Sequence, residues 1–141
     1  MPFALSGKEV VAIEPEASEL REVLRKIKTY GQDVYILVSP IVPPGYSPEQ
    51  VRGYYNGTHK LDAFEDAVKE TMSVYLTTLF QKLPEIDGVV FHSLELGELW
   101  GGVSIFPCKD MDAGLRSMDA YLEAISNTCG TYGRIPVFWT H

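Results

Sequence analysis

Apolar side chains recur at helical spacing in three stretches of the chain, and each stretch predicts an amphipathic helix. These stretches are residues 16–29, 61–82 and 112–127. Gly31 follows the first and Pro84 the second, and both residue types commonly end helices. Each predicted helix therefore has one face to bury and one face for solvent.

Short apolar runs lie between and after these helices, and they predict strands. Three of them are Val34–Val38, Val89–Phe91 and Ile135–Trp139, and Val10–Ile13 is a fourth candidate. Because the runs do not alternate with polar residues, we expect strands that are buried on both faces, as in a parallel sheet. Residues 41–59 are rich in Pro, Gly and Tyr, and we expect a long loop of a functional or mobile kind there.

The β-α-β order predicts an α/β fold with a parallel sheet and helical crossovers. The 141 residues suit one α/β domain, residues 1–141. Three or four strands are too few to close a (β/α)8 barrel, which needs about 200 residues or more. The choice is between a small open α/β layer and an incomplete (β/α)8 (TIM) barrel. The end of the chain two residues after the last strand favours the barrel segment.

Charge and motifs narrow the function classes. The net charge is −7 with no basic cluster, which argues against nucleic acid and anionic membrane surfaces as partners. We see no membrane span and no signal peptide, so we expect a cytoplasmic protein. Cys108 and Cys129 lack the spacing of a metal site and are expected to be free thiols, although a disulfide between them stays open. Nucleotide fingerprints and a GxSxG elbow are absent, and we expect neither a cofactor nor a metal.

Polar residues gather after the predicted strands, whose carboxyl ends meet at one edge of a parallel sheet. Glu95 is the candidate general acid, because the neighbouring Phe91 and Leu94 would raise the pKa of its carboxyl group. The candidate site residues are Glu95 and Glu98 for catalysis, and His92, Tyr54, Tyr55, Asn56, Trp100 and His141 for substrate binding. Carboxylates, imidazoles and aromatic rings together suit carbohydrate. Solvated carboxylates and tyrosines that pack a loop onto the body are the structural alternative.

Several of these elements resemble the middle of the catalytic barrel of the α-glucuronidases and related large glycoside hydrolases. They are the run YGQDVYILVSP, a helix ending in LFQKLPEIDGVVF, the strand end GVVFHSLELG, a helix and a strand VFW, and they span about residues 30–141. In that family a Lys-x-x-x-Glu-Gly motif supplies the catalytic acid and a lysine that holds the uronic acid carboxylate. Here His92 stands at the lysine position, and Glu95 stands one residue before the family's glutamate. The resemblance implies a hydrolase that acts on uronic-acid-containing carbohydrate.

Three functions stay open on the sequence alone. The first is a glycoside hydrolase-like barrel segment, for which only the acid half of a catalytic carboxylate pair can be named. The second is a non-catalytic α/β module that binds a sugar or another small polar ligand. The third is a half-barrel scaffold that forms a homo-oligomer through its open barrel edges.

Overall fold

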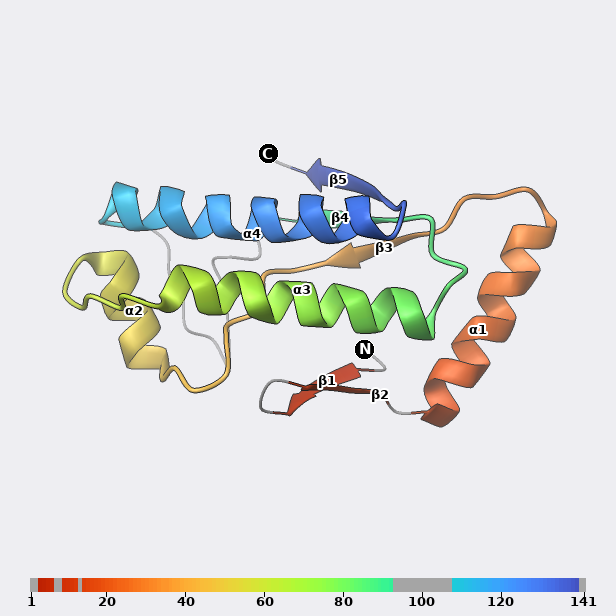
Figure 1. Ribbon diagram of the computed structural model, residues 1–141, viewed down its shortest axis with the longest axis horizontal. Helices are drawn as coiled ribbons and strands as arrows, with labels where there is room; N and C mark the ends of the chain where they lie inside the picture. The colour runs from red at the N-terminus through yellow and green to blue at the C-terminus, as the bar shows by residue number, and fades with distance from the viewer. Residues whose placement is uncertain (1–2, 7–8, 13, 93–107, 140–141) are drawn as a thin grey trace.

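The protein is an α/β structure in which two long helices cover one face of a small parallel sheet (Figure 1). The computed structural model describes residues 3–6, 9–12, 14–92 and 108–139, and side chains within 18–92 and 108–139. In chain order the elements are β1 (Phe3–Ser6), β2 (Glu9–Ala12), α1 (Glu14–Thr29), β3 (Tyr35–Val38), α2 (Pro48–Asn56), α3 (Phe64–Lys82), β4 (Gly88–His92), α4 (Met111–Thr131) and β5 (Ile135–Trp139). The alternation of helices and strands agrees with the apolar pattern of the sequence.

Strands β3, β4 and β5 form a three-stranded parallel sheet in sequential order, which confirms the predicted parallel sheet. The fourth candidate strand, Val10–Ile13, overlaps β2 but does not belong to this sheet. Strand β2 pairs antiparallel with β1 in a separate two-stranded sheet. Only two residues separate β1 from β2 in the sequence, and such a short connection permits an antiparallel pair but no parallel crossover.

The expectation of a long loop over residues 41–59 is wrong, because α2 lies inside it. Ser47 and Gln50 form a capping box, in which Gln50 N donates to Ser47 Oγ at 3.2 Å and Ser47 N donates to Gln50 Oε1 at 2.8 Å. Pro48 occupies the start of the helix, where it costs no hydrogen bond. Gly57 ends the helix with a positive φ of 74°, a conformation that favours glycine.

The core lies between the sheet and the paired helices α3 and α4. Phe91 of β4 is almost fully buried, and its ring stacks on Tyr121 of α4 with centroids 5.8 Å apart. The Tyr121 hydroxyl donates to the carbonyl of Ile41 at 3.0 Å, so this contact also fixes the chain after β3. None of the described helices is long and apolar enough to cross a membrane.

The strands are not buried on both faces, contrary to the expectation from their apolar runs. Because α3 and α4 lie on the same face of the sheet, alternate residues on the opposite face stay accessible to solvent. Leu37 of β3 is 52% exposed and Ile135 of β5 is 53% exposed. The sheet therefore has one covered face and one open apolar face.

Asp87 connects the beginnings of all three parallel strands. Its carboxylate accepts hydrogen bonds from Val34 N at 2.7 Å and from Lys28 Nζ at 2.7 and 2.8 Å. Its backbone N donates to Val34 O at 2.8 Å, and its carbonyl accepts from Ile135 N at 3.0 Å. The hydrogen bonds from Lys28 and Val34 lower the pKa of Asp87.

We predict that Asp87→Asn destabilises the protein at neutral pH and weakens its acid sensitivity. A carboxyl group with a lowered folded-state pKa stabilises the fold above its unfolded pKa of about 3.9. That contribution is lost as the pH falls through the folded-state value. The free energy of unfolding of the variant should therefore lie below that of the parent at pH 7, and the two should converge as the pH falls from about 4 through the folded-state pKa of Asp87.

Urea unfolding at a series of pH values measures both effects. Asp119→Asn, an exposed position on α4, is the matched control and should follow the parent chain. Identical pH dependence in the parent and in Asp87→Asn would contradict the role given to Asp87.

Candidate functional site

The carboxyl ends of the three parallel strands and the N-termini of α3 and α4 lie at the same end of the molecule (Figure 1). Helix α2 lies at this end too, between β3 and α3 in the chain. In α/β proteins this is the end where ligands bind, because the loops and helix N-termini converge there. The sequence predicts the site at this edge of the sheet, and that stays a prediction.

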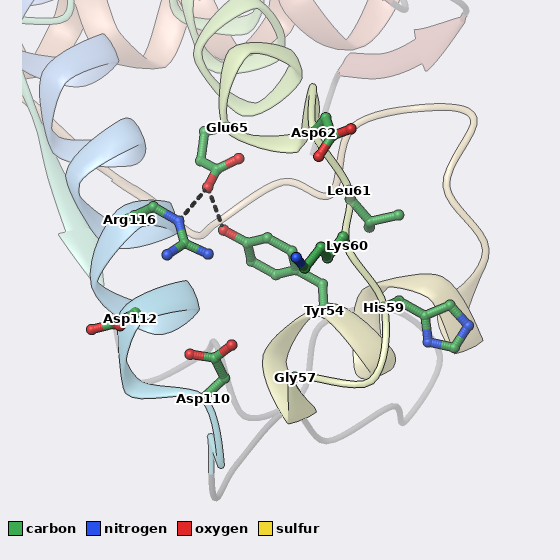
Figure 2. A pocket seen from close by; sticks show the side chains of 10 residues that line it. All are labelled: Tyr54, Gly57, His59, Lys60, Leu61, Asp62, Glu65, Asp110, Asp112 and Arg116. Atoms are coloured by element: carbon green, nitrogen blue, oxygen red, sulfur yellow. Dashed lines mark hydrogen bonds and ion pairs between the residues drawn. The ribbon is translucent and has the colours of Figure 1, made fainter.

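A pocket of about 440 Å³ opens between α2, the segment after it and the first turns of α3 and α4. The residues that line it are Tyr54, Gly57, His59, Lys60, Leu61, Asp62, Glu65, Asp110, Asp112 and Arg116. Figure 2 shows these side chains around the opening. Nearly all of them are polar, so the pocket suits a ligand with many hydrogen-bonding groups.

Tyr54, Glu65 and Arg116 form a hydrogen-bonded group on one wall of the pocket, one residue from each of three helices (Figure 2). The Tyr54 hydroxyl donates to Glu65 Oε1 at 2.7 Å, and Arg116 Nε donates to the same oxygen at 2.9 Å. The Tyr54 ring packs against Phe64 with centroids 4.6 Å apart, which holds the hydroxyl in place. The group links α2, α3 and α4 at the rim of the pocket.

The protonation states of this group follow from its contacts. Burial acts to raise the pKa of Glu65, but the hydrogen bonds from Tyr54 and Arg116 outweigh it and leave the pKa below its ordinary value. Burial and the neighbouring Glu65 raise the pKa of Tyr54. At neutral pH, Glu65 is therefore an ionised acceptor and Tyr54 a protonated donor, so Glu65 is unsuited to be a general acid.

Three further carboxylates face the pocket. Asp110 caps α4, since its Oδ1 accepts from Ala113 N at 3.1 Å, and Asp112 lies in the first turn of the same helix. Both positions suit a negative charge, because a helix N-terminus carries partial positive charge. Asp62 is exposed in the segment before α3. With Glu65, the pocket holds four carboxylates against the two cations Lys60 and Arg116.

Only part of the residues predicted for the site lie within the described structure. Glu95, Glu98, Trp100 and His141 lie outside the described residues. His92 ends β4 on the open face of the sheet, with its ring centroid 4.6 Å from that of Trp139.

The other predicted residues, Tyr54, Tyr55 and Asn56, occupy the last turn of α2. Tyr54 lines the pocket, whereas Tyr55 is 2% exposed and packs edge-on against the rings of Tyr54 and Phe64. Burial raises the pKa of Tyr55 to about 12. Asn56 is half-buried and is not among the residues that line the pocket.

Glu65 and Arg116 were not predicted for the site. They lie 51 residues apart on two different helices, where the sequence shows only polar residues of amphipathic helices. Their signal lies in their positions near the N-terminal ends of α3 and α4, which meet once the two helices pack side by side. The two residues can be recognised as neighbours only once the packing of α3 against α4 is known.

Metal and thiol chemistry find little support in the described part of the chain. No group of three or more His, Cys, Asp or Glu side chains there could hold a metal ion. Cys108 and Cys129 are free, as expected from their spacing. Burial raises the pKa of both thiols, that of Cys129 to about 11, so neither is an activated nucleophile.

No protein-family model matches the chain, and no curated protein and no solved structure matches it either. The resemblance to α-glucuronidases therefore stays a prediction from the order of elements and the GVVFHSLELG segment. The function of the site is therefore inferred from the geometry of its residues.

We predict that Arg116→Gln raises the pKa of Glu65. The arginine donates a charge-assisted hydrogen bond that stabilises the ionised carboxylate and lowers its pKa. Without this hydrogen bond, the effect of burial, which raises the pKa of Glu65, is less well balanced. An NMR pH titration of the Glu65 side-chain carboxyl carbon measures the change. Lys82→Gln, which removes a positive charge in the last turn of α3 at the opposite end of that helix, should leave that titration unchanged. An unaltered Glu65 titration in Arg116→Gln would contradict the proposed electrostatics.

Proposed function

We propose that the chain binds a small hydroxyl-rich ligand, and specifically a carbohydrate, in the pocket between α2, α3 and α4. The pocket of about 440 Å³, with its Tyr54–Glu65–Arg116 group, is the observation that carries the proposal. Sugar hydroxyls both donate and accept hydrogen bonds, so they need acceptors and donors in one site. The four carboxylates supply acceptors, and Lys60 and Arg116 supply donors.

The charge balance of the pocket favours a neutral sugar over a uronic acid. Four carboxylates stand against two cations, so a ligand carboxylate would meet net repulsion. Neutral hydroxyl groups meet no such penalty, and carboxylates accept strong hydrogen bonds from them. We therefore assign the pocket to neutral saccharide units.

We infer further that this binding site belongs to a barrel-like α/β unit of the glycoside hydrolase type. The sequential order β3-β4-β5, with both crossover helices on one face, supports this proposal. In a (β/α)8 barrel the helices form an outer ring and the active site lies at the carboxyl ends of the strands. Glu95 follows β4 by three residues in the sequence, which suits its proposed role as general acid in such a unit.

We predict that Asp62→Asn weakens saccharide binding about tenfold, which corresponds to about 1.4 kcal/mol. Asp62 is exposed at the pocket, and Asn keeps its size while removing one carboxylate acceptor. Isothermal titration calorimetry with neutral xylo- and gluco-oligosaccharides, and with a glucuronate-bearing oligosaccharide, gives the affinities.

Asp66→Asn is the matched control, because Asp66 is exposed four residues further along and does not line the pocket. It should bind like the parent chain. Absence of heat with every saccharide, or equal weakening in both variants, would remove the carbohydrate assignment.

For the catalytic part of the proposal, we predict that Glu95→Gln lowers glycoside hydrolysis by about 10²-fold or more. A general acid contributes on the order of 10²–10⁴ to the rate, and glutamine cannot donate the proton. Turnover of aryl glycosides and glucuronoxylan fragments measures the effect, with Glu98→Gln as the companion variant. Unchanged turnover in Glu95→Gln would exclude Glu95 from the mechanism, and an inactive parent chain would favour binding without catalysis.

A further inference from the structure

The sheet face opposite α3 and α4 carries a row of large apolar side chains that the described chain leaves accessible to solvent. The five most exposed are Tyr35 (38%), Leu37 (52%), Ile135 (53%), Val137 (39%) and Trp139 (48%). Their neighbours Val89 and Phe91, which point to the helices, are 0% and 1% exposed. The contrast separates one covered face of the sheet from one uncovered face.

These side chains form one continuous surface, here called the open face, because the strand register sets them in rows. Tyr35, Gly88 and Ile135 are aligned across the sheet, as are Leu37, Val90 and Val137, and His92 with Trp139. The Tyr35 ring covers Gly88 so closely that a Cβ there would lie 2.6 Å from it. The described strand residues of the open face include no Asp, Glu, Lys or Arg, in a chain of net charge −7.

The size of the open face suits an interface. Five large side chains that are 38–53% exposed leave an apolar patch on the order of 500 Å², a size that commonly marks an interaction site. Two such faces in contact would bury about 1,000 Å² of total surface, which is the lower limit for a specific protein–protein interface. Two apolar sheet faces also pack well at about 10 Å, as in a β-sandwich.

The open face is the surface through which two copies of this chain can meet without bringing like charges together. Two copies carry −14 together, so most approaches between their surfaces are repulsive. The open face brings no carboxylate into the contact and requires no charge to be desolvated. A two-fold axis would place each row against the equivalent rows of the other copy, which gives a closed, self-complementary contact.

The outer edge of β5 is less suited to the contact than the open face. Ile135 N donates toward β4, to Asp87 O, so the alternation of the strand directs the next nitrogen, that of Pro136, to the outer edge. Proline has no N–H, and an added strand would lack one ladder hydrogen bond there. The contact between copies is therefore made by faces and not by this edge.

We propose that the open face of the β3-β4-β5 sheet is the interface of a face-to-face homodimer of this chain. Leu37, Val137 and Trp139 lie at the middle and at the carboxyl end of that interface. The pocket between α2, α3 and α4 lies on the helical side of the molecule and stays accessible in the dimer.

Sedimentation equilibrium over a wide concentration range tests the proposal on the intact chain. We expect a species of twice the chain mass of 15.8 kDa. Leu37→Asp should raise the dissociation constant at least about 100-fold, because each copy would bury an unpaired carboxylate. Leu115→Asp is the matched control, since Leu115 is a 63% exposed leucine on α4, and its dissociation constant should equal that of the parent.

Trp139 gives a second readout that does not depend on the aspartate variant folding. In a Trp100→Phe background, the Trp139 emission should shift to shorter wavelength as concentration rises, because the indole leaves water on association. A monomer at all concentrations, or a dimer whose dissociation constant is unchanged by Leu37→Asp, would overturn the proposal. An emission spectrum independent of concentration across the association range would overturn it as well.

Discussion

The hydrogen bonds and the ion pair that Asp87 forms are the interactions on which the rest of the structure depends. Parallel strands have no hairpin to set their register, so contacts at their ends must do it. Asp87 binds Val34 before β3 through both backbone and side chain, accepts from Ile135 at the start of β5, and holds Lys28 of α1. The alignment of all three strands starts from this residue.

That alignment determines what meets at the other end of the sheet. With the strands in register from Gly88 onward, His92 and Trp139 become neighbours at the carboxyl edge. The same register places Phe91 under Tyr121, and the Tyr121 hydroxyl then fixes the chain after β3 at Ile41. The pocket is built on this support, because α3 and α4 must lie side by side before Glu65 can reach Arg116.

The sequence predicts the order of the long helices and the parallel strands well, because apolar stripes and short apolar runs can be recognised without knowing how the elements pack. The nine residues of α2 are too few for a clear apolar stripe, and the Pro and Gly around them suggest a loop. The capping box of Ser47 and Gln50 is the feature of the sequence that indicates this helix. Whether Leu37 is buried could not be predicted, since burial depends on which layers exist and not on the strand itself. The Tyr54–Glu65–Arg116 group depends on helix packing for the same reason.

The two-layer arrangement leaves a physical problem that its own helices do not solve. Sequential strands with right-handed crossovers place every helix on the same face, so each added β-α unit enlarges the open face along with the covered one. A closed barrel solves this by curving the open face onto itself, and a dimer solves it by covering one such face with another. The absence of charge along Leu37, Val90 and Val137 suits either solution. Pro136 has no N–H, so a strand added at the outer edge of β5 would lack one hydrogen bond. Contact between two sheet faces is therefore favoured over the addition of a strand at this edge.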